Sequence, residues 1–350
     1  MKRVSGVGKV KSSIFYILWI VSGKILNETF VIVCIAKIFE NFKQMQYRWV
    51  VVHNNWSVVK RHILFVDKYQ DVQFVDSWTL NNIEYIVFMD RPAMIMKPIT
   101  IKQTCVVAKQ KVFYAKDEMQ EFRQKFKNLF KISYIGHIFT LSVCPASYKL
   151  LNEWLVYDVN EVNALSVTIC FEPPHVVVFD MDSTLITEEE EVQIRDDNIY
   201  CALDELKSMN CVLCLWSYGT REHVVYSLNK VGLKGYFNII LAEGKYVGDY
   251  NVSATTDTYN NVVYKNTPFY LDLLDKKNIP KSPRVVLWYL QKHNINAIKT
   301  ITLVDDLIDN NIGYDNFVNL STCPVPVQDW DKWHNKIVDF IKDYDYTYIN

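Results

Sequence analysis

The second half of the chain carries the clearest pattern of hydrophobic and polar positions. Short apolar runs alternate there with longer segments in which apolar residues recur at helical spacing. The runs predict strands buried on both faces, at residues 175–180, 211–216, 237–241, 300–304 and 317–320. The longer segments predict helices at residues 196–209, 220–231, 282–293 and 329–343. This alternation predicts an α/β fold, with a parallel sheet covered by helices on both faces.

The first half of the chain gives a mixed pattern. Apolar runs predict strands at residues 47–53, 83–89 and 104–108, and residues 115–132 predict an amphipathic helix with basic side chains outside its apolar face. We expect a solvated surface helix that covers its own core; a surface for nucleic acid or for an acidic partner is the alternative. No cluster of reactive residues occurs in this half, so its role stays open.

The run SIFYILWIV at residues 13–21 follows several basic residues, as the apolar part of a signal peptide does. It ends at Ser22, well short of the roughly 20 residues that cross a bilayer, and no small-residue cleavage site follows. We therefore expect a buried or partner-facing helix, in a protein that is not secreted and has no transmembrane segment. Association with a membrane is the alternative.

Charge divides the 350-residue chain into two parts. Residues 1–165 carry 22 Lys and Arg against 13 Asp and Glu, whereas residues 166–350 carry 16 against 26. Together with the change of pattern, this predicts a basic, mixed α/β N-terminal domain over 1–165 and a second domain over 166–350. The basic part suits proximity to nucleic acid, and the acidic part suits a cationic partner or a metal.

The eight cysteines are scattered, unlike those of a small disulfide-stapled domain. Cys211 and Cys214 form a CxxC, a spacing that also occurs in redox and zinc sites. They lie in a predicted strand, where residues three apart point to opposite faces. We expect a buried structural pair.

Reactive side chains gather where the predicted strands end and where one helix begins. These residues are Asp180, Asp182, Ser217, Lys281, Asp305 and Asp306. Because the carboxyl ends of parallel strands meet at one edge of a sheet, where ligands bind, we expect the six to lie together. A lone pair of aspartates could simply cap a loop. Four ordered segments that converge on one edge indicate a site.

Each residue type has a role in phosphoryl transfer. The Asp180 carboxylate can attack phosphorus and form an aspartyl-phosphate. Mg²⁺ would bring the two anions together, held by Asp180, Asp306 and the backbone carbonyl of Asp182. Asp182 is displaced enough to act first as an acid and then as a base. Ser217 can donate a hydrogen bond to a phosphoryl oxygen, and Lys281 can neutralise charge on the transferred group.

The segments FDMDSTLI, WSYGT, KSPRVVL and LVDDLIDN resemble the four ordered motifs of the haloacid dehalogenase (HAD) superfamily of phosphatases. The resemblance implies a HAD-like Rossmannoid sheet, with Asp180 as the nucleophile and Asp182 as the acid and base. It makes Ser217 the hydroxyl of the second motif and Lys281 the lysine of the third.

The fourth motif, LVDDLIDN, corresponds to the metal-binding segment of that superfamily. The resemblance makes Asp306 a metal ligand and Asp305 an additional ligand or a supporting residue. The last acidic position of the motif falls on Asp309 or Asn310, depending on the alignment.

The segments DMDSTLITEEEEVQIRD, LWSYGTREHV and IPKSPRVVL are closer still to the 38K family of baculoviruses and related insect viruses. That resemblance covers roughly residues 170–320. It implies a nucleocapsid-associated protein phosphatase needed for capsid assembly, located in the virion nucleocapsid and the host nucleus. Its implied substrate is the small basic, protamine-like protein that packages viral DNA, and its implied partners include capsid proteins.

Two stretches that could cover the site are short. The insert ITEEEEVQIR leaves room for a flap and for no cap domain, and residues 242–280 suit a hairpin or a small subdomain. An open site favours a phosphorylated protein over a sequestered metabolite. The glutamates at 188–191 could attract a basic tail, although such a run is more often a solvated face.

Two alternatives keep the same scaffold. One is a small-molecule or polynucleotide phosphatase, and the other is a structural capsid protein with a vestigial site. Near the motifs, we expect Arg195 and Arg284 in surface or core-edge ion pairs, with a phosphate clamp as the alternative. We expect Trp216 in packing and Tyr218 at the substrate entrance. For His223 we expect a place on a helix face near the site, with a phosphate contact as the alternative.

Overall fold

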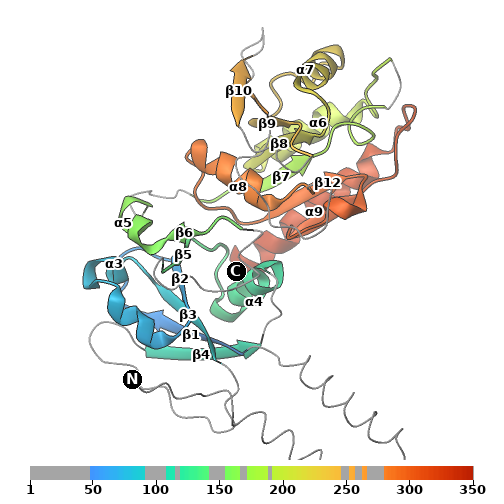
Figure 1. Ribbon diagram of the computed structural model, residues 1–350. Coiled ribbons are helices and arrows are strands. Elements are labelled where there is room, and N and C mark those ends of the chain that lie inside the picture. Colours follow the sequence, from blue (N-terminus) through green and yellow to red (C-terminus); the bar gives the residue numbers. More distant parts are fainter. Residues whose placement is uncertain are drawn as a thin grey trace, which may run out of the picture. The chain divides into compact units, whose positions relative to one another are not determined.

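The computed structural model describes residues 48–90, 108–114, 119–141, 154–165, 172–187, 191–245, 252–256, 262–265 and 280–349. The segment Tyr47–Asn350 forms one compact unit (Figure 1). The predicted helix at residues 13–21 and most of the predicted strand at 104–108 lie outside the described residues. Among the helices that are described, none is both long enough and apolar enough to cross a bilayer.

The described residues up to 165 form a mixed six-stranded sheet in the order β4-β1-β3-β2-β5-β6. Its strands are β1 (Arg48–Asn54), β2 (Ile63–Val66), β3 (Tyr85–Asp90), β4 (Ala108–Tyr114), β5 (Ile138–Thr140) and β6 (Tyr157–Asp158). Its helices are η1 (Tyr69–Phe74), α3 (Ser77–Asn81), α4 (Met119–Phe130), η3 (Val159–Glu161) and α5 (Val162–Leu165). The pairs on either side of β1 are antiparallel, and the others are parallel. The mixed α/β architecture predicted for this half is confirmed.

The described residues from 172 onward form a seven-stranded sheet in the order β10-β11-β9-β8-β7-β12-β13. Its strands are β7 (His175–Phe179), β8 (Cys211–Ser217), β9 (Ile239–Ala242), β10 (Ser253–Thr256), β11 (Val262–Lys265), β12 (Ile301–Asp305) and β13 (Asn316–Asn319). Its helices are α6 (Asn198–Ser208), α7 (Arg221–Lys230), α8 (Pro283–Lys292), η4 (Ile308–Asn310) and α9 (Trp330–Ile349). Apart from the antiparallel β10–β11 pair, all neighbouring strands are parallel. The predicted α/β class is confirmed.

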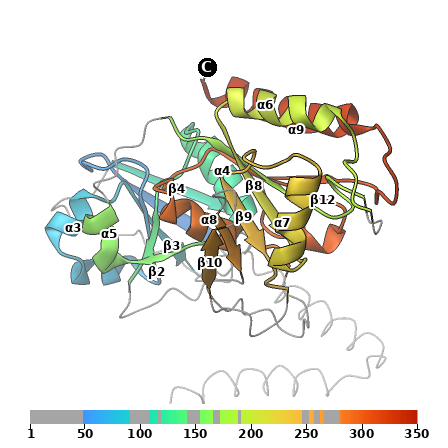
Figure 2. The same cartoon turned by 90° about the horizontal axis from the view of Figure 1, so that it is seen from above.

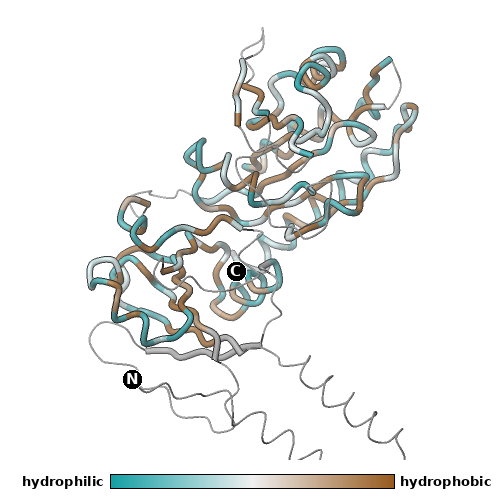
Figure 3. Tube along the Cα trace, in the orientation of Figure 1, coloured by the Kyte–Doolittle hydropathy of each residue, from teal (hydrophilic) through white to brown (hydrophobic). Residues whose placement is uncertain are grey.

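Strand β7 shows why an uninterrupted apolar run is needed at the centre of this sheet. Val177 and Phe179 pack on one face with α6, α7 and α9, and Val176 and Val178 pack on the other face with α8. Helices α6 and α9 lie side by side over the first of these faces (Figure 2). In Figure 3 the strands are mostly brown, whereas the helices alternate between brown and teal, because each helix buries only one side.

The predicted boundary at 165 falls between β6 and β7, and the division into two domains stays a prediction. One hydrophobic cluster nonetheless contains residues of both sheets, including Phe65 and Val87 from the first and Val178 and Leu303 from the second. The two sheets therefore bury one face each in a shared hydrophobic core.

Helix α4 departs from the solvated surface helix that its sequence predicts. The side chains of Arg123 and Lys127 are almost completely buried. Arg123 forms an ion pair with Asp315 at 2.8 Å and lies over the ring of Trp154, while Lys127 Nζ donates to the carbonyl of Lys299 at 3.0 Å. These partners come from segments far along the chain, so the helical pattern alone could not reveal that the basic side chains point inward.

Strand β7 lies at the point where the sheet changes direction. From β7 the chain adds β8 and β9 on one side, and β12 and β13 on the other. Such a reversal leaves a crevice at the carboxyl ends of the central strands, where ligands bind in open α/β sheets. Three neighbouring strands, β8, β7 and β12, end there.

Candidate active site

Asp180 is the first residue after β7, and the sheet fixes its backbone. Its N–H donates to the carbonyl of Val304 at 2.9 Å, and its side chain is buried. The chain then turns sharply, because the amides of Leu185 and Ile186 both return to the carbonyl of Met181 at 2.9 and 3.1 Å. This turn holds the nucleophile candidate rigidly and sends the next carboxylate in another direction.

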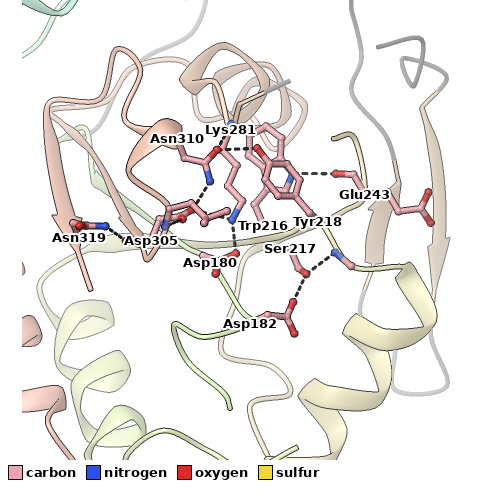
Figure 4. A network of polar contacts seen from close by, with 12 residues as sticks. Asp180, Asp182, Trp216, Ser217, Tyr218, Glu243, Lys281, Asp305, Asn310 and Asn319 are labelled. Carbon is pink, nitrogen blue, oxygen red and sulfur yellow. Dashed lines mark hydrogen bonds and ion pairs between the residues drawn. The ribbon is translucent and has the colours of Figure 1, made fainter. Parts of the chain in front are cut away.

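Lys281 reaches the same point from the start of α8. Its ammonium forms ion pairs with Asp180 and with Asp305, and its side chain is completely buried (Figure 4). Its backbone N–H donates to Asn310 Oδ1 at 3.3 Å, which anchors the residue before the helix begins. The ring of Tyr218 lies 4.9 Å from the ammonium and adds a cation–π contact.

Asp305 ends strand β12 and Asp306 follows it, beside Asp180. Each of the three can contribute a carboxylate oxygen to a group whose atoms all lie within 4.8 Å of one another. The loop is held by Asn319, whose amide donates to the carbonyls of Asp305 and Asp306 at 3.0 and 2.9 Å. Three carboxylates around one buried ammonium leave an excess of negative charge. The group could therefore bind a metal ion, and its hard oxygen donors suit a hard cation.

The pKa values of the buried pair reflect burial first and the neighbouring charges second. Burial raises the pKa of Asp180 to about 7; the charge of Lys281 opposes the rise, and Asp305 adds to it. Burial by itself would lower the pKa of Lys281, but the Asp180 and Asp305 carboxylates raise it above its ordinary value. Lys281 is thus an ammonium at neutral pH, and a second cation would be needed to hold Asp180 fully ionised.

Asp182 points away from the acidic group toward β8 and α7. Ser217, the last residue of β8, donates through Oγ to Asp182 Oδ2 at 2.9 Å and accepts from the N–H of Gly219 at 2.9 Å (Figure 4). The other oxygen, Oδ1, lies 2.6 Å from His223 Nε2. The Asp182 and His223 side chains are each a little over one third exposed. Both oxygens of this carboxylate are therefore held at the solvent-facing side of the site.

Asn310 connects three parts of the site. Its Oδ1 accepts from the Tyr218 hydroxyl at 2.9 Å, and its Nδ2 donates to Asp305 Oδ2 at 3.0 Å. The side chain is buried, whereas Asp309 beside it is exposed. Of the two residues left open by the sequence, Asn310 is the one that contacts the other site residues. Burial raises the pKa of the Tyr218 hydroxyl, which stays a donor.

Comparison with known proteins gives the lineage of this chain. A family model with the description "Protein of unknown function (DUF705)" matches residues 47–349. The chain belongs to the DUF705 family. An uncharacterized 41.0 kDa protein of Cryptophlebia leucotreta granulosis virus is 57% identical over 350 residues, which are 99% of this chain and 100% of that protein. An uncharacterized 38.0 kDa protein of Autographa californica nuclear polyhedrosis virus is 39% identical, over 87% of this chain and 98% of that protein.

Solved structures were matched over about half of this DUF705 chain. A protein from Listeria monocytogenes serotype 4b has 17% identity and a TM-score of 0.30, over 48% of this chain and 99% of that one. A "putative beta-phosphoglucomutase" of Thermotoga maritima has 13% identity and a TM-score of 0.29, with the same coverage of both chains.

The six site residues that the sequence of this DUF705 chain predicts form two adjoining groups. The first contains Asp180, Lys281, Asp305 and Asp306, and the second pairs Asp182 with Ser217. The metal group identified among the described residues does not include the Asp182 carboxylate. Its backbone carbonyl stays a predicted ligand.

Sequence reasoning gave His223 a place near the site without its contact to Asp182. The available signal was that Thr220 caps a helix just after the strand that ends at Ser217. The first turn of that helix must therefore lie at the same edge of the sheet as Asp182. Residue types alone could not show which side chain of the turn reaches the carboxylate.

Several neighbouring residues are structural. Arg195 is buried and forms an ion pair with Asp329 at 2.8 Å, as predicted, and its guanidinium also donates to the carbonyl of Ser183 at 3.0 Å. Trp216 is buried in the core, which confirms the packing expectation.

Cys211 and Cys214 are buried free thiols that pack on opposite faces of the sheet, as expected. Burial raises both of their pKa values, to about 12 for Cys211, so neither is a thiolate.

Glutamates 188–190 lie outside the described residues, so the flap interpretation stays a prediction. Glu191 is exposed, with its carboxylate 3.9 Å from Lys230 Nζ.

Chemically, the site combines a buried carboxylate beside an ammonium, a group that could bind metal and a second carboxylate near solvent. These are the elements of nucleophilic phosphoryl transfer with separate acid–base catalysis.

Proposed function

We propose that this protein is a Mg²⁺-dependent phosphatase that works through an aspartyl-phosphate on Asp180. The observation that carries the proposal is the difference in surroundings between two carboxylates that lie two residues apart in the sequence. Asp180 is buried between Lys281 and the acidic pair of β12, whereas Asp182 is held toward solvent by Ser217. A structural pair of aspartates would not need such different surroundings.

In the first half-reaction, a carboxylate oxygen of Asp180 attacks phosphorus, and the bond from phosphorus to the leaving oxygen breaks. Asp182 delivers a proton to that oxygen, so the product leaves as a neutral alcohol. Lys281 offsets negative charge on the attacking oxygen and on the transferred group. The Ser217 hydroxyl, which donates to Asp182 Oδ2 at 2.9 Å, would orient a phosphoryl oxygen only by turning its single proton away from Asp182.

In the second half-reaction, water attacks the phosphorus of the aspartyl-phosphate. Asp182, now a carboxylate, takes a proton from that water as the new bond forms, and the Asp180–phosphorus bond breaks. Inorganic phosphate and the original carboxylate are released. Each step uses the same two aspartates in reversed roles, so no additional acid or base is required.

The described residues that would hold Mg²⁺ are Asp180, Asp305 and Asp306, with the carbonyl of Asp182 as a predicted fourth. When bound, the ion supplies positive charge that lets an anionic nucleophile approach an anionic phosphoryl group. Burial is the main cause of the raised pKa of Asp180, and a bound cation would favour the ionised carboxylate that the nucleophile requires.

For the substrate we propose a phosphorylated, basic protein that packages DNA. The side chain of Asp182 is over one third exposed, which leaves room for a bulky phosphorylated residue. The acidic balance of residues 166–350, with 26 acidic against 16 basic side chains, suits a cationic chain. Two relatives come from a granulosis virus and a nuclear polyhedrosis virus, and the sequence resemblance to the 38K family implies a basic DNA-packaging protein as the substrate.

We propose that the protein acts in the virion nucleocapsid and the host nucleus, where it would contact capsid proteins during assembly. The basic half of the chain, residues 1–165, would then lie near nucleic acid. The sequence resemblance supports this location, and the charge balance of the chain supports the contact with nucleic acid.

The deciding experiment measures hydrolysis of 4-nitrophenyl phosphate by the full chain with Mg²⁺ and with EDTA. We expect Mg²⁺-dependent turnover that Asp180→Asn abolishes, and a phosphoenzyme in the wild type that survives acid quenching. Absent turnover, or turnover that persists in Asp180→Asn, would contradict the proposal. Lys292→Met, at an exposed residue of α8, is the matched control and should leave turnover unchanged.

The substrate class has a separate test. A phosphoserine peptide rich in Arg is compared with one of equal length in which the Arg residues are replaced by Gln. We expect the higher kcat/KM for the basic peptide, with a gain that shrinks as salt rises. Equal values at low salt would remove the basic protein from the proposal and leave the phosphatase in place.

A further inference from the structure

His223 is a side chain of this site to which the proposed reaction gives no role. Its Nε2 lies 2.6 Å from Asp182 Oδ1, within hydrogen-bond distance of the acid and base of the proposed reaction. Ser217 Oγ donates to Asp182 Oδ2 at 2.9 Å, so each oxygen of the carboxylate has a hydrogen-bond partner. A carboxylate held by one donor alone could still rotate about its terminal torsion angle, which has a broad minimum.

The local backbone is built so that His223 can reach this position. Thr220 caps α7, and its side chain accepts from the N–H of His223 at 3.3 Å, which fixes the first turn. Gly219 lies directly beneath the imidazole. A Cβ added there would lie 2.7 Å from His223 Cδ2, closer than real Cβ contacts, and 3.0 Å from Ser217 Oγ, which is tight. The absence of a side chain at Gly219 is therefore what admits the ring.

We propose that His223 is a positioning residue that fixes the Asp182 carboxyl group for proton delivery to the leaving oxygen. The inference rests on the proposed phosphatase function. We assign a proton to Nε2, so that the imidazole donates to Asp182 and acts through it rather than on the substrate. Because misplacement of a catalytic group by about 1 Å can cost 100-fold in rate, loss of this contact should weaken acid catalysis specifically.

The leaving group distinguishes positioning from a general structural role. A nitrophenolate departs readily without a proton, whereas a phenolate needs one from Asp182 in the transition state. We therefore compare 4-nitrophenyl phosphate with phenyl phosphate, which present the same phosphoryl group. The quantity to follow is kcat/KM, which reports phosphoryl transfer to Asp180.

In His223→Ala, we expect kcat/KM for phenyl phosphate to fall about tenfold more than for 4-nitrophenyl phosphate. His223→Gln, whose amide nitrogen falls near the position of Nε2, should restore much of the loss. His223→Asn, whose amide nitrogen corresponds to Nδ1, should not. Glu222→Gln, at the exposed neighbour in the same turn, is the control and should match the wild type for both substrates. Thermal unfolding midpoints establish that the variants are folded.

The outcomes separate this inference from the proposed function. If the wild type is active but His223→Ala loses equally with both substrates, the positioning role is overturned and a phosphate contact or a structural role replaces it. The same holds if Asn and Gln behave alike. If the wild type shows no turnover, or Asp180→Asn stays active, the proposed function fails and the inference falls with it.

Discussion

Lys281 Nζ lies 2.9 Å from Asp305 Oδ2, and both side chains are completely excluded from solvent. A buried ion pair gains little over a pair of apolar residues, but removing one partner leaves the other charge without compensation. Here the lysine serves two carboxylates at once, because it also pairs with Asp180. Loss of the lysine side chain would remove both of these ion pairs and leave the Asp180 and Asp305 carboxylates without the ammonium.

Lys281→Met should therefore lose both activity and stability. We expect turnover to fall to background, and the free energy of unfolding in EDTA to drop by about 3–5 kcal/mol. Mg²⁺ should restore part of that stability, because it supplies positive charge to the same carboxylates. Urea unfolding with EDTA and with Mg²⁺ measures both effects. A variant as stable as the wild type in EDTA would show that Lys281 does not compensate the group.

Asp306→Asn tests the metal group without changing side-chain size. For the wild type, Mg²⁺ at 100 times its dissociation constant should raise the free energy of unfolding by about 2.7 kcal/mol. The variant should lose most of this gain, because one of the three carboxylates can no longer carry a charge. Asp309→Asn, three residues away and exposed, is the control and should keep the gain. Equal Mg²⁺ stabilisation of all three proteins would place the metal elsewhere.

Gly219→Ala should impair catalysis although it adds a single methyl group. The new Cβ would lie 2.7 Å from His223 Cδ2, so the imidazole must shift from the position in which it contacts Asp182. We expect kcat to fall by roughly tenfold or more, in line with the sensitivity of rates to the position of catalytic groups. The double variant Gly219→Ala/His223→Ala should be no slower than His223→Ala alone. Additive losses would mean that the methyl group acts by another route.

How far the sequence predicts this site depends on how local each signal is. Asp180 and Ser217 were found because each ends an apolar run, and because the ends of parallel strands meet. The contact of His223 with Asp182 depends on how α7 is oriented, and no residue pattern reports that. Strand β2, with only four residues, was missed because so short an apolar run has no recognisable period. The inward-facing Arg123 was missed because its partner, Asp315, lies 192 residues further along the chain.

Arg195→Lys should destabilise the protein although it keeps the charge. The Arg195 guanidinium binds Asp329 through Nε and a terminal nitrogen at 2.8 and 3.0 Å, and it donates to the carbonyls of Ser183 and Ser321. A lysine ammonium cannot reproduce this planar set of donors. We expect the free energy of unfolding to fall by about 2–4 kcal/mol, measured in urea. Arg221→Lys, at an exposed ion pair, should change it by less than about 0.5 kcal/mol.

Two buried histidines of the first sheet should make stability depend on pH. Burial lowers the pKa of His62 to about 3 and that of His137 to about 4. In addition, His62 Nδ1 accepts from the backbone N–H of His137 at 3.1 Å, which requires an unprotonated Nδ1. Both rings are therefore neutral in the folded protein at neutral pH.

The sign follows from the direction of these shifts. Unfolded histidine titrates near pH 6.5, so between pH 6.5 and about 4 the unfolded chain binds more protons than the folded one. The stabilisation is complete above pH 6.5 and is lost as the pH falls. Each histidine should cost about 2 kcal/mol between pH 7 and pH 5. Urea unfolding of His62→Asn, whose side-chain oxygen can still accept from His137, should show a pH-dependent loss about 2 kcal/mol smaller than that of the wild type. Equal losses for the two proteins would mean that His62 is not buried as a neutral ring.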